Sequence, residues 1–229
     1  MKSHFKPLPS SEEISLDSLM KRVQRMEDID SIKQLQSTYQ YWLTTGRFEQ
    51  IAEHCFPKAK GIEDVRVEAS DSGVFRGPQG VHDFFVKSLG GLRNLPGSFL
   101  WHMSVNPIIE IARDRQTARA IFISPGVTST PPAWASFAYG IYYNDYIQEE
   151  GEWKMWHVNF NIFFRSPADG TWHKQPIDKP LAKSFNGASD PPSNYHPYNP
   201  DTPGWDLFKH LPDVPVPYDS WSEEIVVEQ

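Results

Sequence analysis

The sequence is poor in cysteine and in long apolar runs. Cys55 is the single cysteine of 229 residues, which excludes an internal disulfide and fits a reducing compartment. No apolar stretch reaches the ~20 residues that span a bilayer, and residues 1–10 lack the apolar core of a signal peptide. We therefore expect a cytoplasmic protein without a membrane partner.

Positive charge is also scarce. The chain has 22 Lys and Arg against 29 Asp and Glu, for a net charge of −7, and no basic cluster reverses this balance. Nucleic-acid surfaces are basic, so no nucleic-acid partner is expected. Aromatic residues are abundant instead, at 14% with eight tryptophans. Such a composition builds either a large aromatic core or a cavity for a flat apolar ligand.

Hydrophobic spacing places helices before strands. A capping box at Ser10–Glu13 precedes helical spacing up to Leu43, and Gly46 is a plausible C-cap. The further expected elements are helices over 48–56 and 79–89, and strands over 65–69, 102–111, 117–124, 133–148 and 152–164. Helices gathered ahead of a meander of strands are typical of an α+β fold.

The composition changes after residue 165. The remaining residues hold about half of the twenty prolines, together with aromatic anchors such as Trp205 and Trp221. Proline-rich segments without apolar residues are usually disordered. The anchors favour an extended arm, packed on its own subunit or on a neighbour, over a disordered tail.

Four stretches in this order resemble the SnoaL-like branch of the nuclear-transport-factor-2-like superfamily: residues 26–35, 72–85, 102–111 and 151–157. The resemblance covers about residues 25–165. It implies a cone-shaped α+β barrel, in which a curved antiparallel sheet wraps around N-terminal helices and encloses a pocket. The expected organisation is a helical extension over 1–25, a SnoaL-like domain over 26–165, and a Pro- and aromatic-rich arm over 166–229.

The stretch 151–157 and the proline-rich tail resemble a subgroup that includes bacterial lyases of lignin-derived diarylpropanes. Those enzymes release formaldehyde from the diarylpropane without a cofactor. The resemblance implies a cofactor-independent lyase with a small aromatic substrate, working as a homo-oligomer (dimer or trimer). Two alternatives stay open: a non-catalytic ligand-binding module, and a polyketide-type dehydratase, cyclase or isomerase.

Two residues are the first candidates for proton transfer. His102 matches the pocket histidine of related dehydratases, and an imidazole titrates near neutrality; alternatively it caps a strand end. Tyr39 lies on the apolar face of its helix, where a phenol can donate to a developing oxyanion. A core tyrosine with a satisfied hydroxyl is the other reading.

The strand over 152–164 carries a polar row and an apolar row on opposite faces. The polar row is His157, Asn159 and Asn161, and the apolar row is Trp156, Val158 and Phe160. If the polar row faces the pocket, His157 pairs with His102, and the arm or a second subunit must cover the apolar row. If it faces outward, the apolar row lines the pocket. We expect the first arrangement.

The predicted site therefore combines catalytic residues with substrate-binding residues. The catalytic set is His102, Tyr39 and His157, and the substrate-binding set is Trp42, Trp101, Asn159 and Asn161. No metal is expected, because no His, Cys and carboxylate cluster has ligand spacing. Thr44 stands near the position where scytalone dehydratase carries an aspartate, so a mechanism based on that carboxylate does not transfer. For Arg66 and Glu68 we expect a surface ion pair rather than a buried base.

Overall fold

The structure is a computed structural model. It describes residues 14–69, 72–130, 134–171, 173–174, 187–192, 196 and 198–223. The capping box expected at Ser10 lies outside the described residues.

The first element is the long helix α1, Leu16–Thr44. It begins at Ser15, whose Oγ accepts a hydrogen bond from the backbone N–H of Ser18, and the Ser18 Oγ accepts one in return from the Ser15 N–H. The helix ends at Thr45, and Gly46 follows with a left-handed φ of +70°. This confirms the C-cap that the sequence predicts at Gly46, since glycine takes that conformation without steric cost.

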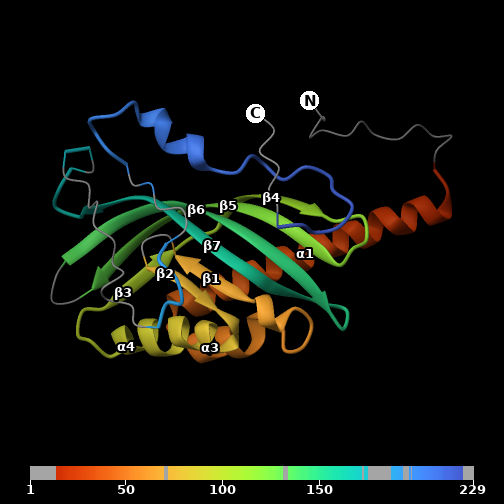
Figure 1. Ribbon diagram of the computed structural model, residues 1–229, viewed down its shortest axis with the longest axis horizontal. Coiled ribbons are helices and arrows are strands. Elements are labelled where there is room, and N and C mark those ends of the chain that lie inside the picture. Colours follow the sequence, from red (N-terminus) through yellow and green to blue (C-terminus); the bar gives the residue numbers. More distant parts are fainter. Residues whose placement is uncertain are drawn as a thin grey trace.

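Shorter helical segments complete the helical layer. They are α2 Phe48–Gln50, a π-helical turn Ile51–Cys55, a 3₁₀ turn Ile62–Asp64, α3 Gly77–His82, a π-helical segment Asp83–Leu89 and α4 Gly90–Arg93. In Figure 1, α3 and α4 lie along one side of the sheet, and α1 runs beneath the sheet and past its end. The expected helix over 79–89 is therefore part of a longer irregular helical stretch.

Seven strands form one curled sheet in the order β2-β1-β7-β6-β5-β3, with β4 also paired to β5. The strands are β1 Arg66–Ala69, β2 Gly73–Arg76, β3 Phe99–His102, β4 Val105–Ile111, β5 Thr117–Thr130, β6 Trp134–Glu149 and β7 Glu152–Pro167. The α+β class and the helix-filled curved sheet are confirmed. Two details differ from expectation: β1 pairs with β7 in parallel, and the predicted strand over 102–111 is two strands.

A β-bulge in β7 decides which residues face the helices. Asp145 of β6 pairs with His157, but Tyr146 pairs with Met155, so Trp156 is an extra residue of β7. An extra residue reverses the alternation of a strand. Met155 and Val158 consequently both belong to the buried core, on either side of the bulge.

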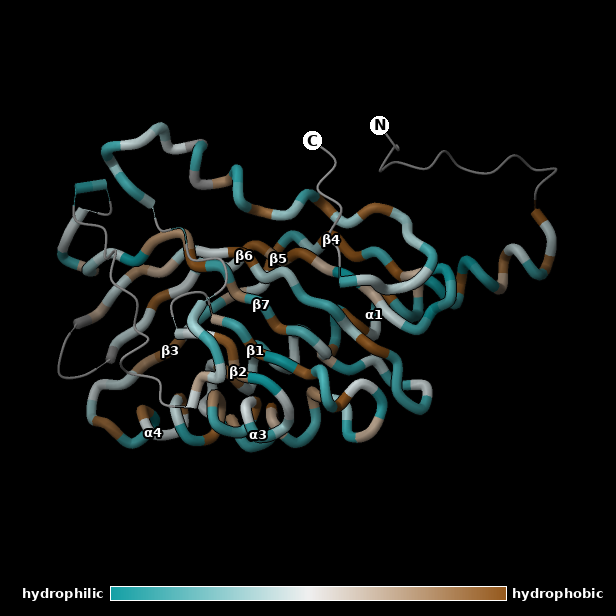
Figure 2. Tube along the Cα trace, in the orientation of Figure 1, coloured by the Kyte–Doolittle hydropathy of each residue, from teal (hydrophilic) through white to brown (hydrophobic). Residues whose placement is uncertain are grey.

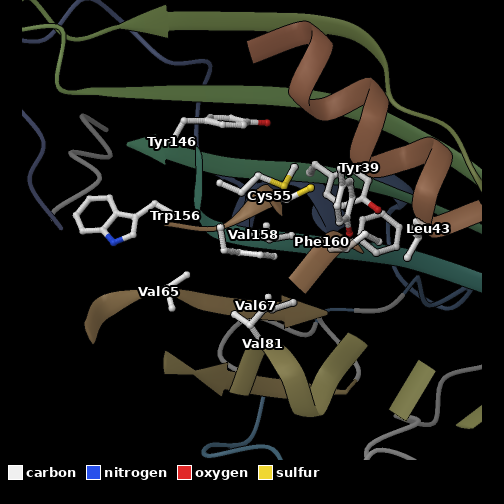
Figure 3. Close-up of a cluster of buried hydrophobic side chains, with 14 of the residues drawn as sticks. Tyr39, Leu43, Cys55, Val65, Val67, Val81, Tyr146, Trp156, Val158 and Phe160 are labelled. Carbon is white, nitrogen blue, oxygen red and sulfur yellow. The ribbon is translucent and has the colours of Figure 1, made fainter. Parts of the chain in front are cut away.

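The space between helices and sheet is filled by aromatic and aliphatic side chains. Figure 3 shows Tyr39 and Leu43 of α1 gathered with Val158 and Phe160 of β7. A polar cluster ties α1 to the sheet: the Gln36 Oε1 accepts hydrogen bonds from the Tyr146 hydroxyl at 2.7 Å and from the Asn144 amide at 3.1 Å. Because these groups are buried and bonded to one another, they fix the position of α1 against β6.

Residues 198–223 of the C-terminal arm pack on the outer face of the same chain's sheet, opposite the helices (Figure 1). The Arg113 N–H donates to the Tyr218 carbonyl at 3.0 Å, and the Trp221 Nε1 donates to Asp145 at 3.0 Å. Nearer its start, the arm lies beside β2, where the Val74 N–H donates to the Asp190 carbonyl. In these parts the arm is packed, as its aromatic anchors suggest.

Candidate active site

A cavity of about 300 Å³ lies between the helices and the inner face of the sheet. Its walls are mostly apolar, and His102, Tyr39 and Tyr142 bring polar atoms to it. The apolar lining comes from β1 and β7 on the sheet side and from α1 and the π-helical segment on the helix side: Val67, Ala69, Val158, Phe160, Ile162, Leu43, Phe84 and Leu89. The volume is at the lower end of the usual range for small-molecule sites, about 300–1,000 Å³.

His102 closes β3 and lies in the cavity wall with only 7% of its surface exposed. Burial lowers the pKa of His102 to about 4, because a low-dielectric environment disfavours the imidazolium. The ring meets Phe160 edge to face at a centroid distance of 5.2 Å. The imidazole is therefore neutral at neutral pH and can accept a proton.

One edge of the His102 ring is packed against the neighbouring strand. His102 is in register with Gly126 of β5, and a Cβ at Gly126 would lie 2.7 Å from His102 Cε1 and closer still to Nδ1. The Nδ1 atom is buried and has no hydrogen-bond partner among the residues that the structure describes. This packing leaves Nε2 as the nitrogen available to a ligand.

Two phenols stand together in the same cavity. The rings of Tyr39 and Tyr142 meet edge to face at 6.2 Å, and Tyr142 also stacks on Phe160 at 4.5 Å. Burial raises the pKa of both hydroxyls. Both groups therefore remain protonated, and a protonated phenol can donate a hydrogen bond to a bound molecule.

Carboxylates contribute little to the cavity. Thr44 lines it at the end of α1, as the comparison with dehydratases suggests. Glu68 is buried and borders the cavity, but its register with Asn159 assigns its side chain to the opposite face of the sheet. Glu68 is thus not a surface residue, and Arg66 forms an ion pair with Glu223 of the arm at 3.5 Å.

The structure places the polar row of β7 outside this cavity. The His157 Nδ1 bonds to Asp145 at 2.8 Å, and its ring contacts the indoles of Trp156 and Trp221, which also contact each other under the arm. Asn159 and Asn161 follow on the same outward row, and the cavity is lined by Val158, Phe160 and Ile162 instead. The expected pairing of His157 with His102 is wrong, because the bulge at Trp156 turns the apolar row inward and the arm covers the polar one.

The two tryptophans expected to stack a substrate do not line the cavity. Trp101 points away from it between the inward residues Leu100 and His102, and 49% of its surface is exposed. Trp42 packs against His54 at a ring distance of 5.9 Å. Of the predicted catalytic and substrate-binding residues, only His102 and Tyr39 line the same cavity. Tyr142, Phe160 and Gly126 were missed, although Phe160 belonged to the alternative reading of β7.

Other candidate chemistry is limited in the part of the chain that the structure describes. Burial raises the pKa of the Cys55 thiol to about 12, so this cysteine stays protonated. The described residues contain no group of three or more His, Cys, Asp or Glu side chains placed to hold a metal ion. Among the helices of the same residues, none has the length and apolar character to cross a bilayer.

Comparison with solved structures finds the same fold in several proteins. A candidate scytalone dehydratase from Novosphingobium aromaticivorans is 14% identical, with a TM-score of 0.53, over 69% of this chain and 95% of that one. A hexachlorocyclohexane dehydrochlorinase (LinA-type3) from Novosphingobium barchaimii is 15% identical, with a TM-score of 0.55, over 66% and 96%. At these identities the likeness shows the fold alone. The structural neighbours thus include lyase-type enzymes.

Comparison with curated proteins finds no match. A family model, that of the SnoaL-like domain, matches residues 24–159. This match spans more than half of the chain and contains most of the residues that line the cavity. The chain therefore belongs to the SnoaL-like family.

Proposed function

We propose that this protein is a cofactor-independent lyase that uses His102 as the general base on a small aromatic substrate. The observation that carries the proposal is the pairing of a neutral, buried imidazole with two protonated phenols in one apolar cavity. The aromatic lining, with Phe84 and Phe160, suits stacking against a flat ring.

The environment of His102 selects the kind of reaction. Its low pKa makes it a weak base in the empty cavity, since the imidazolium is poorly solvated there. A negative charge that develops next to the ring would stabilise the imidazolium as it forms. Elimination supplies such a charge on the substrate, and the Tyr142 hydroxyl can donate a hydrogen bond to the developing oxyanion or leaving group.

A diaryl propanediol fits these two roles. His102 Nε2 would remove the proton of the primary hydroxyl, and the carbon–carbon bond would break to release formaldehyde. The electron pair of that bond would form the new carbon–carbon double bond and expel the benzylic hydroxyl. Tyr142 would hydrogen-bond the departing oxygen, which leaves as water after taking up the proton that His102 removed from the primary hydroxyl. The products are a stilbene, formaldehyde and water.

One observation favours the alternative, a non-catalytic ligand-binding module. Within the described part of the chain, the buried Nδ1 of His102 has no hydrogen-bond partner, whereas a catalytic histidine is commonly oriented by an acceptor on its second nitrogen. In this reading the imidazole accepts a hydrogen bond from a phenolic ligand and transfers no proton.

Turnover of diaryl propanediols and hydroxylated polyketide-like compounds, followed by formaldehyde release and product absorbance, tests the proposal. We expect His102→Gln to lower kcat by about 10²–10⁴-fold. His82→Gln is the matched control, because His82 is on α3 outside the cavity lining. Full activity of His102→Gln on a substrate of the wild type would refute the assignment of the base. Saturable ligand binding without turnover across the panel would favour the binding module.

A further inference from the structure

The first turns of α1 extend past the edge of the sheet (Figure 1). Among the described residues, the first hydrogen bonds from α1 to the sheet come from Arg25, which binds the Ile111 carbonyl at 3.2 Å and Glu110 at 2.9 Å. In Figure 2, hydrophobic and hydrophilic residues alternate along this protruding end. Five apolar residues there are 40–74% exposed and form the N-terminal stripe: Leu16, Leu19, Met20, Val23 and Met26.

The stripe is not a continuation of the core-facing side of α1. Leu16, Met20 and Val23 each precede a buried residue of the helix (Ile32, Gln36 and Tyr39) by the same interval of sixteen positions. Sixteen residues of an α-helix correspond to a rotation of about 160°. The stripe thus points almost directly away from the domain that the same helix holds together. A helix with apolar side chains on that side requires another surface to cover them.

Four of the five stripe residues are placed symmetrically about the level of position 21 along the helix, and Met20 lies next to that level. In an antiparallel pair of these helices with a twofold axis at that level, Leu16 would face Met26 of the second copy, and Leu19 would face Val23. A twofold interface requires such self-complementarity, since each contact occurs twice. The stripe therefore fits a second copy of itself.

The exposed area of the stripe and the charges beside it both suit a second copy of this chain as the binding partner. From their exposed fractions, the five side chains present on the order of 600 Å² per copy, or about 1,200 Å² in a pair, at the lower bound of stable interfaces. The charged neighbours of the stripe are Asp17 and Glu27 against Lys21 and Arg22, which cancel. A helix for anionic membranes carries mainly Lys and Arg on its polar face, and the whole chain has a net charge of −7.

We propose that the N-terminal stripe of α1 is the interface of a twofold-symmetric homodimer, in which two α1 helices pack antiparallel through their stripes with the twofold axis at the level of position 21. This interface is separate from the cavity and does not depend on the proposed lyase activity. It leaves the cavity of each copy intact, because the stripe and the cavity lining share no residue.

Sedimentation velocity of the full chain over a concentration series measures the association. We expect the wild type to dimerise and Met20→Glu to dissociate at least tenfold more readily, because it buries a charge at the centre of the interface. Lys21→Glu, on the same turn but off the stripe, is the control, and its larger change of charge should have a smaller effect. A dimer that Met20→Glu leaves unchanged would assign the interface to another surface.

Disulfide cross-linking checks the antiparallel geometry. Cys55 is buried, so an introduced cysteine is the only accessible thiol in the described part of the chain. Met20→Cys lies next to the twofold axis, so this variant should oxidise to a covalent dimer with itself. Met26→Cys should form a covalent dimer only when it is mixed with the Leu16→Cys variant, because these two positions face each other in the antiparallel pair. A wild type that stays monomeric at all concentrations, and binds vesicles containing phosphatidylserine, would overturn the proposal in favour of a lipid surface.

Discussion

Replacement of Gly126 by alanine would show how the position of the His102 ring affects catalysis, because it moves the imidazole without changing its chemical identity. The new Cβ would lie 2.7 Å from both His102 Cε1 and the Trp101 carbonyl oxygen, and closer to Nδ1. Carbon atoms in contact are normally about 3.5–4.0 Å apart, so the ring must move by about 1 Å. Overpacking of this kind costs about 1–3 kcal/mol of folding free energy.

The expected functional loss is larger than the loss of stability. A displacement of about 1 Å in a catalytic group reduces rates by about 10²-fold, so Gly126→Ala should reduce turnover to that extent while the protein remains folded. Gly91→Ala is the control, because Gly91 has no neighbour within 4 Å of an added Cβ and an unstrained φ.

Nuclear magnetic resonance of the imidazole gives a readout that does not depend on the substrate. In the wild type the His102 ring should remain neutral at pH 5.5, since burial lowers its pKa to about 4. In Gly126→Ala the displaced ring should titrate at higher pH, because displacement opens the packing that excludes water from it. An unchanged titration together with undiminished turnover would refute the contact between Gly126 and His102 as the determinant of ring position.

Three further predictions concern the cavity and the arm. Burial lowers the His102 pKa to about 4 from 6.5, so the unfolded chain binds one proton more than the folded chain between these pH values. The free energy of unfolding, measured by urea titration, should therefore fall by up to about 3 kcal/mol as the pH drops through this window. His102→Gln should reduce this dependence of stability on pH. Tyr142→Phe should lower kcat by about 10²–10³-fold. The control is Tyr146→Phe, because the Tyr146 hydroxyl donates to Gln36 and neither residue lines the cavity. This control should cost about 1 kcal/mol of stability and leave kcat unchanged. Trp221→Ala should lower stability by about 1–3 kcal/mol in thermal unfolding, because it uncovers His157 and its stacked indole neighbour; an unchanged melting temperature would contradict the packed arm.

Local patterns in the sequence were sufficient for the elements with strong periodicity. The α1 helix, its C-cap at Gly46 and the long strands β5, β6 and β7 follow from spacing and turn residues. The sequence does not predict β2, because this strand of four residues begins at Gly73 and is followed by Gly77, and such glycines signal turns.

The site was harder to predict because one residue changes the face of a strand. Alternation along β7 correctly separates a polar and an apolar row, yet nothing local reveals the bulge at Trp156 that turns the apolar row inward. Tyr142 is one of four tyrosines in β6, and only the curvature of the sheet brings it to Tyr39. The pairing of Gly126 with His102 depends on strand register, which the sequence of either strand alone does not specify.

The parallel pairing of β1 with β7 also has a consequence for how the cavity comes to exist. Val67 and Ala69 meet Val158 and Phe160 only when the last strand of the sheet joins one of the first. Contacts of such long sequence separation form late, since loop closure must precede them. During synthesis the aromatic wall of the cavity has no counterpart until β7 has left the ribosome, so a chain interrupted before that point exposes its apolar helices and binds no ligand. If the cavity binds an aromatic molecule, as proposed, its affinity would report complete folding, and the bound molecule would slow the separation of β1 from β7.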